Sequence, residues 1–427
     1  MYPNLYYLFK ELFGISLPPL KIVNSFGFFV AMSFLAAAYF FIKELRRKQA
    51  QGIFTYEETQ VTIGKPASTQ ELALNFLLGF TLGFKILGVF LVENALNNPQ
   101  VFIFSREGSW PAGILCGVFF AGLKWYEKNK VKLKQPETRT VRIWPSDRVG
   151  DVVIIAAAAG FFGAKLFDNF ENWDRFVQDP IGNLLSPSGL TFYGGLICAT
   201  LALYWYFRKH KISFINICDA AAPSLMAAYG SGRVGCQVAG DGDWGIVNSA
   251  YISDPNGKIL PATSVEQVKQ IAAANANFYS QYGPVENLHH ASFKASLLPD
   301  WFVAYTYPHN VNSEGIPIPG CTWGEYCNHL PLPVFPTPLY EIIVCLLLFW
   351  ALWAIRKRIS IPGRLFAIYL IMNGVERFFI EKIRVNSRYS IFGFHPTQAE
   401  IISTLLVIAG VVLYYYAPKF RKTAVRQ

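Results

Sequence analysis

The sequence has few charged residues and few cysteines, and its histidines follow no metal-ligand spacing. Charged residues make up 15% of the 427 positions, against 52% for apolar residues. That balance argues against the two or three soluble domains that the length could hold. The six histidines form no His-x-x-x-His pair and no close pattern with cysteine, so we expect no metal site. The sequence also lacks a Walker A loop and a dinucleotide glycine fingerprint, and we expect no cofactor.

Most of the seven cysteines lie in apolar runs, where they are typical of a membrane core. Cys321 and Cys327 differ, because they flank Thr-Trp-Gly-Glu-Tyr in a long polar segment. A disulfide between them requires that segment to lie outside the cytoplasm, where thiols are oxidised. The spacing alone leaves the pairing open. Met1 to Val23 lack a basic start and a small-residue cleavage site, so we expect no cleavable signal peptide.

Long apolar runs dominate the chain. Nine of them reach, or nearly reach, the roughly 17–25 residues that a helix needs to cross a bilayer. The sequence therefore predicts an all-α polytopic integral membrane protein with about nine transmembrane helices. The runs cover residues 24–43, 72–93, 110–126, 149–168, 189–207, 214–234, 338–355, 364–382 and 398–417.

Basic clusters follow every odd-numbered apolar segment, from Arg46-Arg47-Lys48 after the first to the lysines and arginine at 419–422 after the ninth. Such clusters mark the cytoplasmic ends of membrane helices. We therefore expect the amino end outside and the carboxyl end inside. The net charge of +10 then reflects topology and contact with anionic membrane lipids, and we expect no nucleic-acid partner.

This topology places residues 240–335 outside, where a loop of that length is expected to fold on its own as an extracytoplasmic cap. The segment from 60 to 145 is interpreted as an inserted hairpin. Its Gly79 to Lys85 resembles Gly160 to Lys165, and each copy leads to a Gly-x-x-Cys run, although apolar hairpins can look alike by chance. The predicted domains are residues 1–59 with the first helix, 60–145 the inserted hairpin, 146–239 the core helices, 240–335 the cap, and 336–427 the carboxyl-terminal helices.

A single arginine, Arg233, closes the sixth apolar segment among six glycines, and Asp241 and Asp243 follow it. A charge in a membrane helix is costly, so it is usually paired or functional. The simpler alternative is an arginine whose head group reaches the interface from a helix end. Glycines at these positions would let a backbone or a lipid head group come close.

The eighth segment carries charges at helical spacing. Asn373, Arg377, Glu381 and Arg384 are four, four and three residues apart, which predicts one face of a helix. That face is expected to point into the bundle or a wet cavity. The alternative is an Arg377–Glu381 ion pair that only joins helices.

The stretch around Arg233 resembles the signature of the prolipoprotein diacylglyceryl transferase family, Gly-Arg-x-Gly-Asn-Phe-x-Asn-x-Glu-x-x-Gly. Gly232-Arg233-x-Gly235 matches it directly. The family asparagine falls on Cys236, its glutamate on Asp241 or Asp243, and its final glycine on Gly245.

Two further motifs carry the resemblance. The eighth segment matches the family's Gly-x-x-Arg-x-x-x-Glu-x-x-Arg, with Asn373 where some members have tyrosine. The fifth segment has Tyr193-Gly194-Gly195 where the family has His-Gly-Gly, and that histidine has been proposed as a catalytic base. A tyrosine, with a free pKa of about 10, is a poor base at neutral pH.

Weaker matches lie elsewhere. Lys165 stands where the family has an arginine, and Asp219 fits the family's Asp-x-x-x-Pro. Phe335 to Glu341 resembles His-Pro-Ser-Gln-Leu-Tyr-Glu, and Asn24 to Gly27 stands where members have Trp-Tyr-Gly. The resemblance covers the first and the fourth to ninth segments, but not residues 60–145 or most of the cap.

The resemblance implies an enzyme of the bacterial cytoplasmic (inner) membrane. Members transfer the diacylglyceryl group of phosphatidylglycerol to the lipobox cysteine of preprolipoproteins. By this resemblance Arg233 and Arg377 stabilise the leaving phosphate, and Glu381 orients Arg377. Asp241 or Asp243 orients Arg233 or binds the glycerol head group, and Tyr193 is the positional candidate for the base. The implied substrate-binding residues are Arg233, Arg377, Arg384, Lys165, Gly194, Gly195, Cys236, Asp243, Gly245, Asp219 and Asn373.

A transporter or lipid flippase is the competing interpretation, because repeats and intramembrane charges are typical of transporters. The repeat, however, covers one hairpin and not half of the protein. The charges also gather near the outer ends of the predicted helices rather than at mid-membrane. The sequence therefore favours the enzyme.

Overall fold

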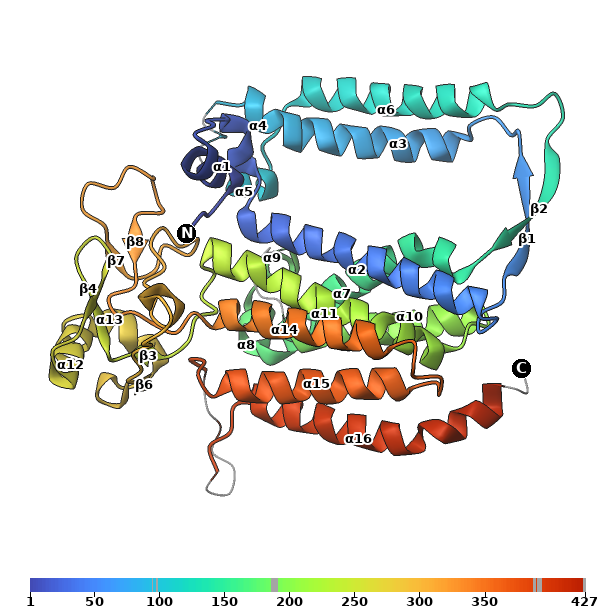
Figure 1. The fold of residues 1–427 in the computed structure, drawn as a ribbon. Coiled ribbons are helices and arrows are strands. Elements are labelled where there is room, and N and C mark those ends of the chain that lie inside the picture. Colours follow the sequence, from blue (N-terminus) through green and yellow to red (C-terminus); the bar gives the residue numbers. More distant parts are fainter. Residues whose placement is uncertain (94, 97–98, 186–190, 387–388, 390–393, 425–427) are drawn as a thin grey trace. The chain divides into compact units, whose positions relative to one another are not determined.

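The computed structural model describes residues 1–427 except 94, 97–98, 186–190, 387–388, 390–393 and 425–427. It divides the chain into two compact units. The first comprises residues 1–16, 23–47 and 213–427, and the second comprises residues 17–22 and 48–212. Helices dominate both units (Figure 1).

The first unit holds the long helices α11, α14, α15 and α16, most of α2, and a set of short elements. Its helices are α1 (Leu5–Phe13), α2 (Ser25–Ala50, of which the last three residues belong to the second unit), α11 (Phe214–Ala239), α12 (Val265–Ala274), α13 (Ala276–Tyr279), α14 (Thr337–Ile355), α15 (Arg364–Glu381) and α16 (Gln398–Ala424). Its strands are β3 (Val247–Asn248), β4 (Tyr251–Ser253), β5 (Ile259–Pro261), β6 (His290–Ala291), β7 (Ile316–Pro317) and β8 (Asn328–His329).

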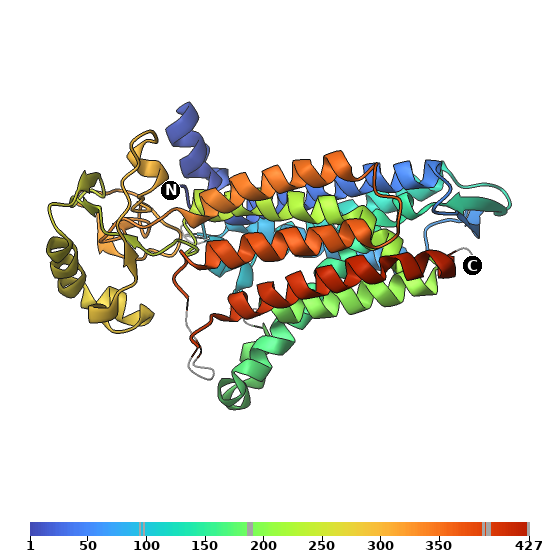
Figure 2. The same cartoon turned by 60° about the horizontal axis from the view of Figure 1, so that its bottom comes forward.

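The helices of this bundle pack against buried apolar side chains of α11. Ala222 and Met226 of α11 are fully buried against Cys345 and Leu352 of α14. A Cβ at Gly230 would come within 3.0 Å of the Cys345 Cβ, so glycine permits this close approach. α15 and α16 lie side by side, as both views show (Figures 1 and 2).

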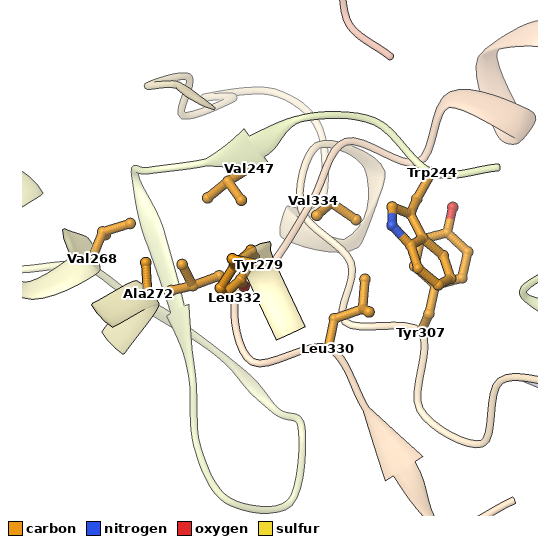
Figure 3. Packing of buried hydrophobic residues seen from close by; sticks show 9 residues of the cluster. All are labelled: Trp244, Val247, Val268, Ala272, Tyr279, Tyr307, Leu330, Leu332 and Val334. Carbon is orange, nitrogen blue, oxygen red and sulfur yellow. The ribbon is translucent and has the colours of Figure 1, made fainter. Parts of the chain in front are cut away.

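Residues 240–335 contain the short helices α12 and α13 and the strands β3 to β8. These elements gather at one end of the long helices of this unit (Figure 1). They have their own apolar core, in which Trp244 packs against Tyr307 while Val247, Leu332 and Val334 come together nearby (Figure 3). The strands pair only in twos: β3 with β6 in parallel, and β4 with β5 and β7 with β8 antiparallel. We call residues 240–335 the cap. The Cys321–Cys327 disulfide, left open by the sequence, is present in it.

The second unit contains two helical hairpins. Its helices are α3 (Thr69–Thr81), which continues as a π-helical turn at Leu82–Leu87, then α4 (Gly88–Leu91), α5 (Pro99–Phe104), α6 (Trp110–Lys130), α7 (Val149–Glu171), α8 (Trp173–Gln178), α9 (Pro180–Leu185) and α10 (Phe192–Lys209). Its strands β1 (Glu57–Ile63) and β2 (Glu137–Ile143) pair antiparallel. The hairpin of α3 and α6 therefore leaves and rejoins the chain through one two-stranded ribbon.

The two hairpins pack alike. In the hairpin of α3 and α6, Gly83 faces Cys116, and a Cβ added at Gly83 would lie 2.7 Å from the Cys116 Cβ. In the hairpin of α7 and α10, Gly163 faces Cys198 in the same way, and a Cβ added at Gly163 would lie 2.4 Å from the Cys198 Cβ. Both glycines thus let the two helices of a hairpin approach closely. The internal repeat stays a prediction.

In the described residues, a helix lies within each of the nine predicted apolar segments, and positions 189–190 of the fifth segment lie outside the described residues. In the described part of the chain, five helices are long and apolar enough to cross a membrane. They are Ser25–Ala50, Thr69–Leu91, Pro145–Glu171, Thr337–Ile355 and Gln398–Lys419. The protein is therefore a helical protein with several candidate membrane spans.

Candidate functional site

The helix that carries Arg233 ends so that the chain folds back over it. α11 stops at Ala239, and Gly240 and Gly242 adopt φ of 67° and 97°. These left-handed conformations favour glycine. The reversal brings the Asp243 carboxylate onto the Arg233 guanidinium, where the two form an ion pair. Of the two acids that the sequence left open, Asp243 is the partner of Arg233.

Arg384 reaches the same place from a different element. The sequence predicted it on the helical face of Arg377, but α15 ends at Glu381 and Arg384 lies beyond it. There it forms a β-bridge with Gly245, while Ile246 N–H donates to the Ile383 carbonyl at 2.8 Å. A Cβ on Gly245 would lie 2.6 Å from that carbonyl, which explains the glycine. The Arg384 side chain pairs with Asp243.

The centre of the cluster is Glu341, in the first turns of α14. Its side chain is 0% exposed. It accepts a hydrogen bond from the Tyr229 hydroxyl at 2.8 Å and lies 3.1 Å from Arg233 Nε and 3.2 Å from Arg377 Nη1. Arg384 Nη1 is 3.6 Å away.

Sequence reasoning missed Glu341, although it quoted the residue within a weak family match. The signal was a lone carboxylate in the highly apolar segment 337–355. Burying a carboxylate in such a segment is expensive unless cations surround it.

Arg377 and Glu381 form the ion pair expected from their spacing, with 2.9 Å between Nη2 and Oε2. Glu381 also accepts a hydrogen bond from the Asn386 side chain at 2.6 Å. Arg377 also contacts Glu341, so it links α15 to α14 in addition to its pair within α15. Asn373 lies one turn before Arg377 in α15.

The cluster brings together three guanidinium groups, with a formal charge of +3, and the three carboxylates of Asp243, Glu341 and Glu381, with −3. Arg233 and Arg377 keep 17% and 22% of their side chains exposed, so an anion can reach them. Arginine binds phosphate through paired N–H donors. The arrangement can therefore accept a phosphate group, with the acids holding the arginines in place beforehand.

The pKa values of the two acids after α11 shift in opposite directions. Burial raises the pKa of the Asp243 carboxyl, but the Arg384 and Arg233 charges outweigh this effect and lower it to about 2. Burial, followed by the neighbouring Asp243 charge, raises the pKa of Asp241. Asp243 is thus a permanent anion at neutral pH, whereas Asp241 takes up a proton more readily than an ordinary aspartate.

Cys236, Asp241 and Asp243 offer one sulfur and two carboxylate oxygens within 4.8 Å of one another. By distance alone these atoms could hold a metal ion. Two arginines already pair with Asp243, and their positive charge opposes a cation there. The site therefore suits an anion better than a metal.

Asp219 does not join this cluster. It lies near the start of α11, fourteen residues from Arg233, or about 21 Å along a helix. Its two carboxylate oxygens accept hydrogen bonds from Gly363 N–H and Phe366 N–H at 2.8 and 2.9 Å. Asp219 therefore caps the start of α15, and its expected contact with substrate stays a prediction.

The remaining candidates, Lys165, Tyr193, Gly194 and Gly195, belong to the second unit. Lys165 is buried in α7, with 4% exposed. Gly194 and Gly195 of α10 pack against α7, and a Cβ on Gly194 would meet the Gly163 carbonyl at 2.6 Å. These two glycines thus serve the closure of their own hairpin.

Part of the chain matches the model of a known protein family. The family model for prolipoprotein diacylglyceryl transferase matches residues 109–416. The match starts within the inserted hairpin, which the sequence resemblance left outside, and it does not include the first predicted span.

Several relatives carry the name phosphatidylglycerol–prolipoprotein diacylglyceryl transferase. The one from Dehalococcoides mccartyi is 25% identical over 278 residues, covering 65% of this chain and 80% of the relative. The one from Leptospira interrogans is 25% identical over 321 residues (68% and 77%), and the one from Staphylococcus haemolyticus is 25% identical over 307 residues (71% and 80%). Since the family model matches well over half of its length, the chain belongs to the prolipoprotein diacylglyceryl transferase family.

Proposed function

We propose that this protein transfers the diacylglyceryl group of phosphatidylglycerol to the lipobox cysteine thiol of preprolipoproteins and forms a thioether. The observation that carries the proposal is the convergence of Arg233, Arg377 and Arg384 on Glu341 and Asp243. Such a cluster suits this reaction, because arginines can stabilise the phosphate that the reaction expels. Family membership also favours this enzyme over the transporter alternative.

In the proposed reaction the deprotonated thiol attacks the glyceryl carbon that bears the phosphate. A carbon–sulfur bond forms, the carbon–oxygen bond to phosphate breaks, and glycerol phosphate leaves with the electron pair. Arg233 and Arg377 stabilise the negative charge that grows on the phosphate oxygens. Glu341 and Glu381 hold the two guanidinium groups in place before substrate arrives, so little reorganisation is needed.

We further propose roles for the residues around this cluster. Asp243 orients Arg233 and Arg384 through its two ion pairs. Asp241, Cys236 and Gly245 border the head group, and Asn373 lies toward it on α15. From the second unit, Lys165 is proposed to contact the lipid phosphate and the Tyr193-Gly194-Gly195 segment to face the substrate.

Tyr193, in its ionised phenolate form, is the proposed acceptor of the thiol proton and becomes the neutral phenol. Replacing Tyr193 with phenylalanine removes only the hydroxyl, and we expect kcat to fall about 10²-fold or more, the usual contribution of a general base. The KM for phosphatidylglycerol should change little. Steady-state kinetics of purified protein check this, with Tyr415→Phe on the exposed face of α16 as the control. An unchanged kcat would assign the proton to another group and leave Tyr193 as an interfacial aromatic residue.

We also propose the membrane arrangement. All nine helical segments cross the bacterial cytoplasmic (inner) membrane, with the amino end and the cap outside and the carboxyl end inside. Residues 60–145 are proposed to be an inserted hairpin, between 1–59 and the core helices of 146–239, and residues 336–427 complete the bundle. The β1–β2 ribbon supports this boundary, because a module whose two ends lie together can be inserted without disturbing its host.

Consumption of lipid tests the proposed function against transport. A transferase uses up one phosphatidylglycerol for each peptide thiol that disappears, whereas a transporter leaves total lipid and thiol unchanged. Purified protein in phosphatidylglycerol vesicles with a lipobox peptide gives both quantities. Equal loss of lipid and thiol supports the enzyme, and no loss of either would contradict it.

A further inference from the structure

A small cavity lies where the cap meets the arginine cluster, within the first unit. Glu381, Arg384 and Asn386 form its polar side, and Trp244, Phe278 and Leu332 of the cap lie on its apolar side. We call it the cap cavity. Trp244 and Leu332 also belong to the buried core of the cap, so this wall is part of a packed cluster (Figure 3).

Arg384 has donors left over on this side. Its side chain is 9% exposed, and its Nη2 is taken by Asp243. Among the described residues, the buried Nε has no hydrogen-bond partner, and Nη1 has only the 3.6 Å ion-pair contact with Glu341. A buried N–H without an acceptor costs about 1–3 kcal/mol. Such a donor at the wall of a cavity indicates an oxygen acceptor on whatever enters it.

The size and walls of the cavity narrow the choice of occupant. Its free volume is about 60 Å³, several times the roughly 10–15 Å³ that one water needs. It therefore takes one small side chain with its neighbouring backbone, but not a lipid acyl chain. A peptide carbonyl supplies the oxygen acceptor, and the aromatic and aliphatic wall accepts a small side chain.

The position of the cavity identifies which part of a polypeptide reaches it. An extended chain advances about 3.3–3.6 Å per residue. Once the reacting cysteine is at the arginines, its next few neighbours therefore lie within about 10 Å. The cap stands beyond the ends of α11, α14 and α15 (Figure 1). In the proposed membrane arrangement the cap is outside, which is the side on which the substrate chain continues after its cysteine.

We infer that the cap cavity binds a small residue among the first three that follow the lipobox cysteine, with Arg384 donating to its backbone carbonyl. The inference rests on the proposed function and adds a specificity determinant to it. The cavity selects substrates by the size of that residue, while Arg233 and Arg377 act on the lipid phosphate.

A paired change of enzyme and peptide tests this. Lipobox peptides carry serine or tryptophan at the first, second or third position after the cysteine, and kcat/KM is measured with phosphatidylglycerol held constant. For the wild type, we expect tryptophan to lower kcat/KM at least tenfold at one of the three positions. The Phe278→Ala variant enlarges the cavity and should raise the tryptophan-to-serine ratio at that position at least tenfold.

The control is Phe293→Ala, which removes an exposed phenylalanine of the cap that does not line the cavity and should keep the wild-type ratio. If Phe278→Ala does not fold, Tyr282→Ala opens the same cavity from its more exposed side. Normal transfer with no size preference, or a ratio unchanged by both enlarging variants, would overturn the inference. Absence of transfer from every peptide by the wild type would instead overturn the proposed function, and this inference with it.

Discussion

Replacing Arg233 with alanine should reduce diacylglyceryl transfer by at least about 10³-fold. One electrostatic donor to a developing oxyanion contributes about 10²–10³ in kcat. Arg233 does more than donate, because it also neutralises Glu341 and Asp243. Arg377→Ala should behave in the same way, since Arg377 pairs with Glu341 and Glu381. Transfer of labelled diacylglyceryl by detergent-purified variants measures the loss.

Two comparisons make the Arg233 result interpretable. Arg233→Lys keeps the charge but loses the paired N–H donors, so we expect intermediate activity. Arg139→Ala removes an exposed arginine from a surface pair with Glu137 and should leave activity within a factor of two. A folded Arg233→Ala protein with near-normal activity would remove the assignment of Arg233 to the leaving phosphate.

Replacing Glu341 with glutamine should both destabilise the protein and abolish transfer. The substitution keeps the shape and one acceptor oxygen but removes the charge that faces three arginines, leaving +3 against −2 in the cluster. Breaking a buried ion pair on one side costs about 3–5 kcal/mol. The arginines then also lose the carboxylate that fixes their positions.

Thermal unfolding in detergent and the transfer assay measure the two effects of Glu341→Gln. The thermal midpoint should drop clearly, and residual activity should be lost even at temperatures where the variant is folded. Glu286→Gln, an exposed acid of the cap, is the matched control with no change expected in either quantity. A midpoint and activity equal to wild type would show that Glu341 is not the centre of the site.

The helical segments could be predicted from sequence because long apolar runs report directly on helices that bury in a membrane or a bundle. The Arg377–Glu381 pair could also be predicted, since four residues separate neighbours on one helical face. Arg384 was misplaced because extrapolating the same spacing assumed that α15 continues. The helix ends at Glu381, and a β-bridge to Gly245 positions Arg384 instead.

Contacts between distant segments were harder to predict. The choice of Asp243 over Asp241 depends on two left-handed glycines whose turn cannot be read from spacing. Glu341 escaped notice because its three arginines come from α11, α15 and the segment after α15, all far away in the chain. Asp219 resembled a family site residue, and its carboxylate accepts a hydrogen bond from Gly363, the N-cap of α15, which lies 144 residues later.

The most direct test of the proposed reaction is transfer of labelled diacylglyceryl from phosphatidylglycerol to a synthetic lipobox peptide by the purified protein. We expect a thioether product that disappears when the peptide cysteine is replaced by serine, together with released glycerol phosphate. Folded protein that gives no thioether from phosphatidylglycerol would contradict the central proposal. The differences from the family motifs at Tyr193, Cys236 and Asn373 would then explain why this chain lacks the family's chemistry.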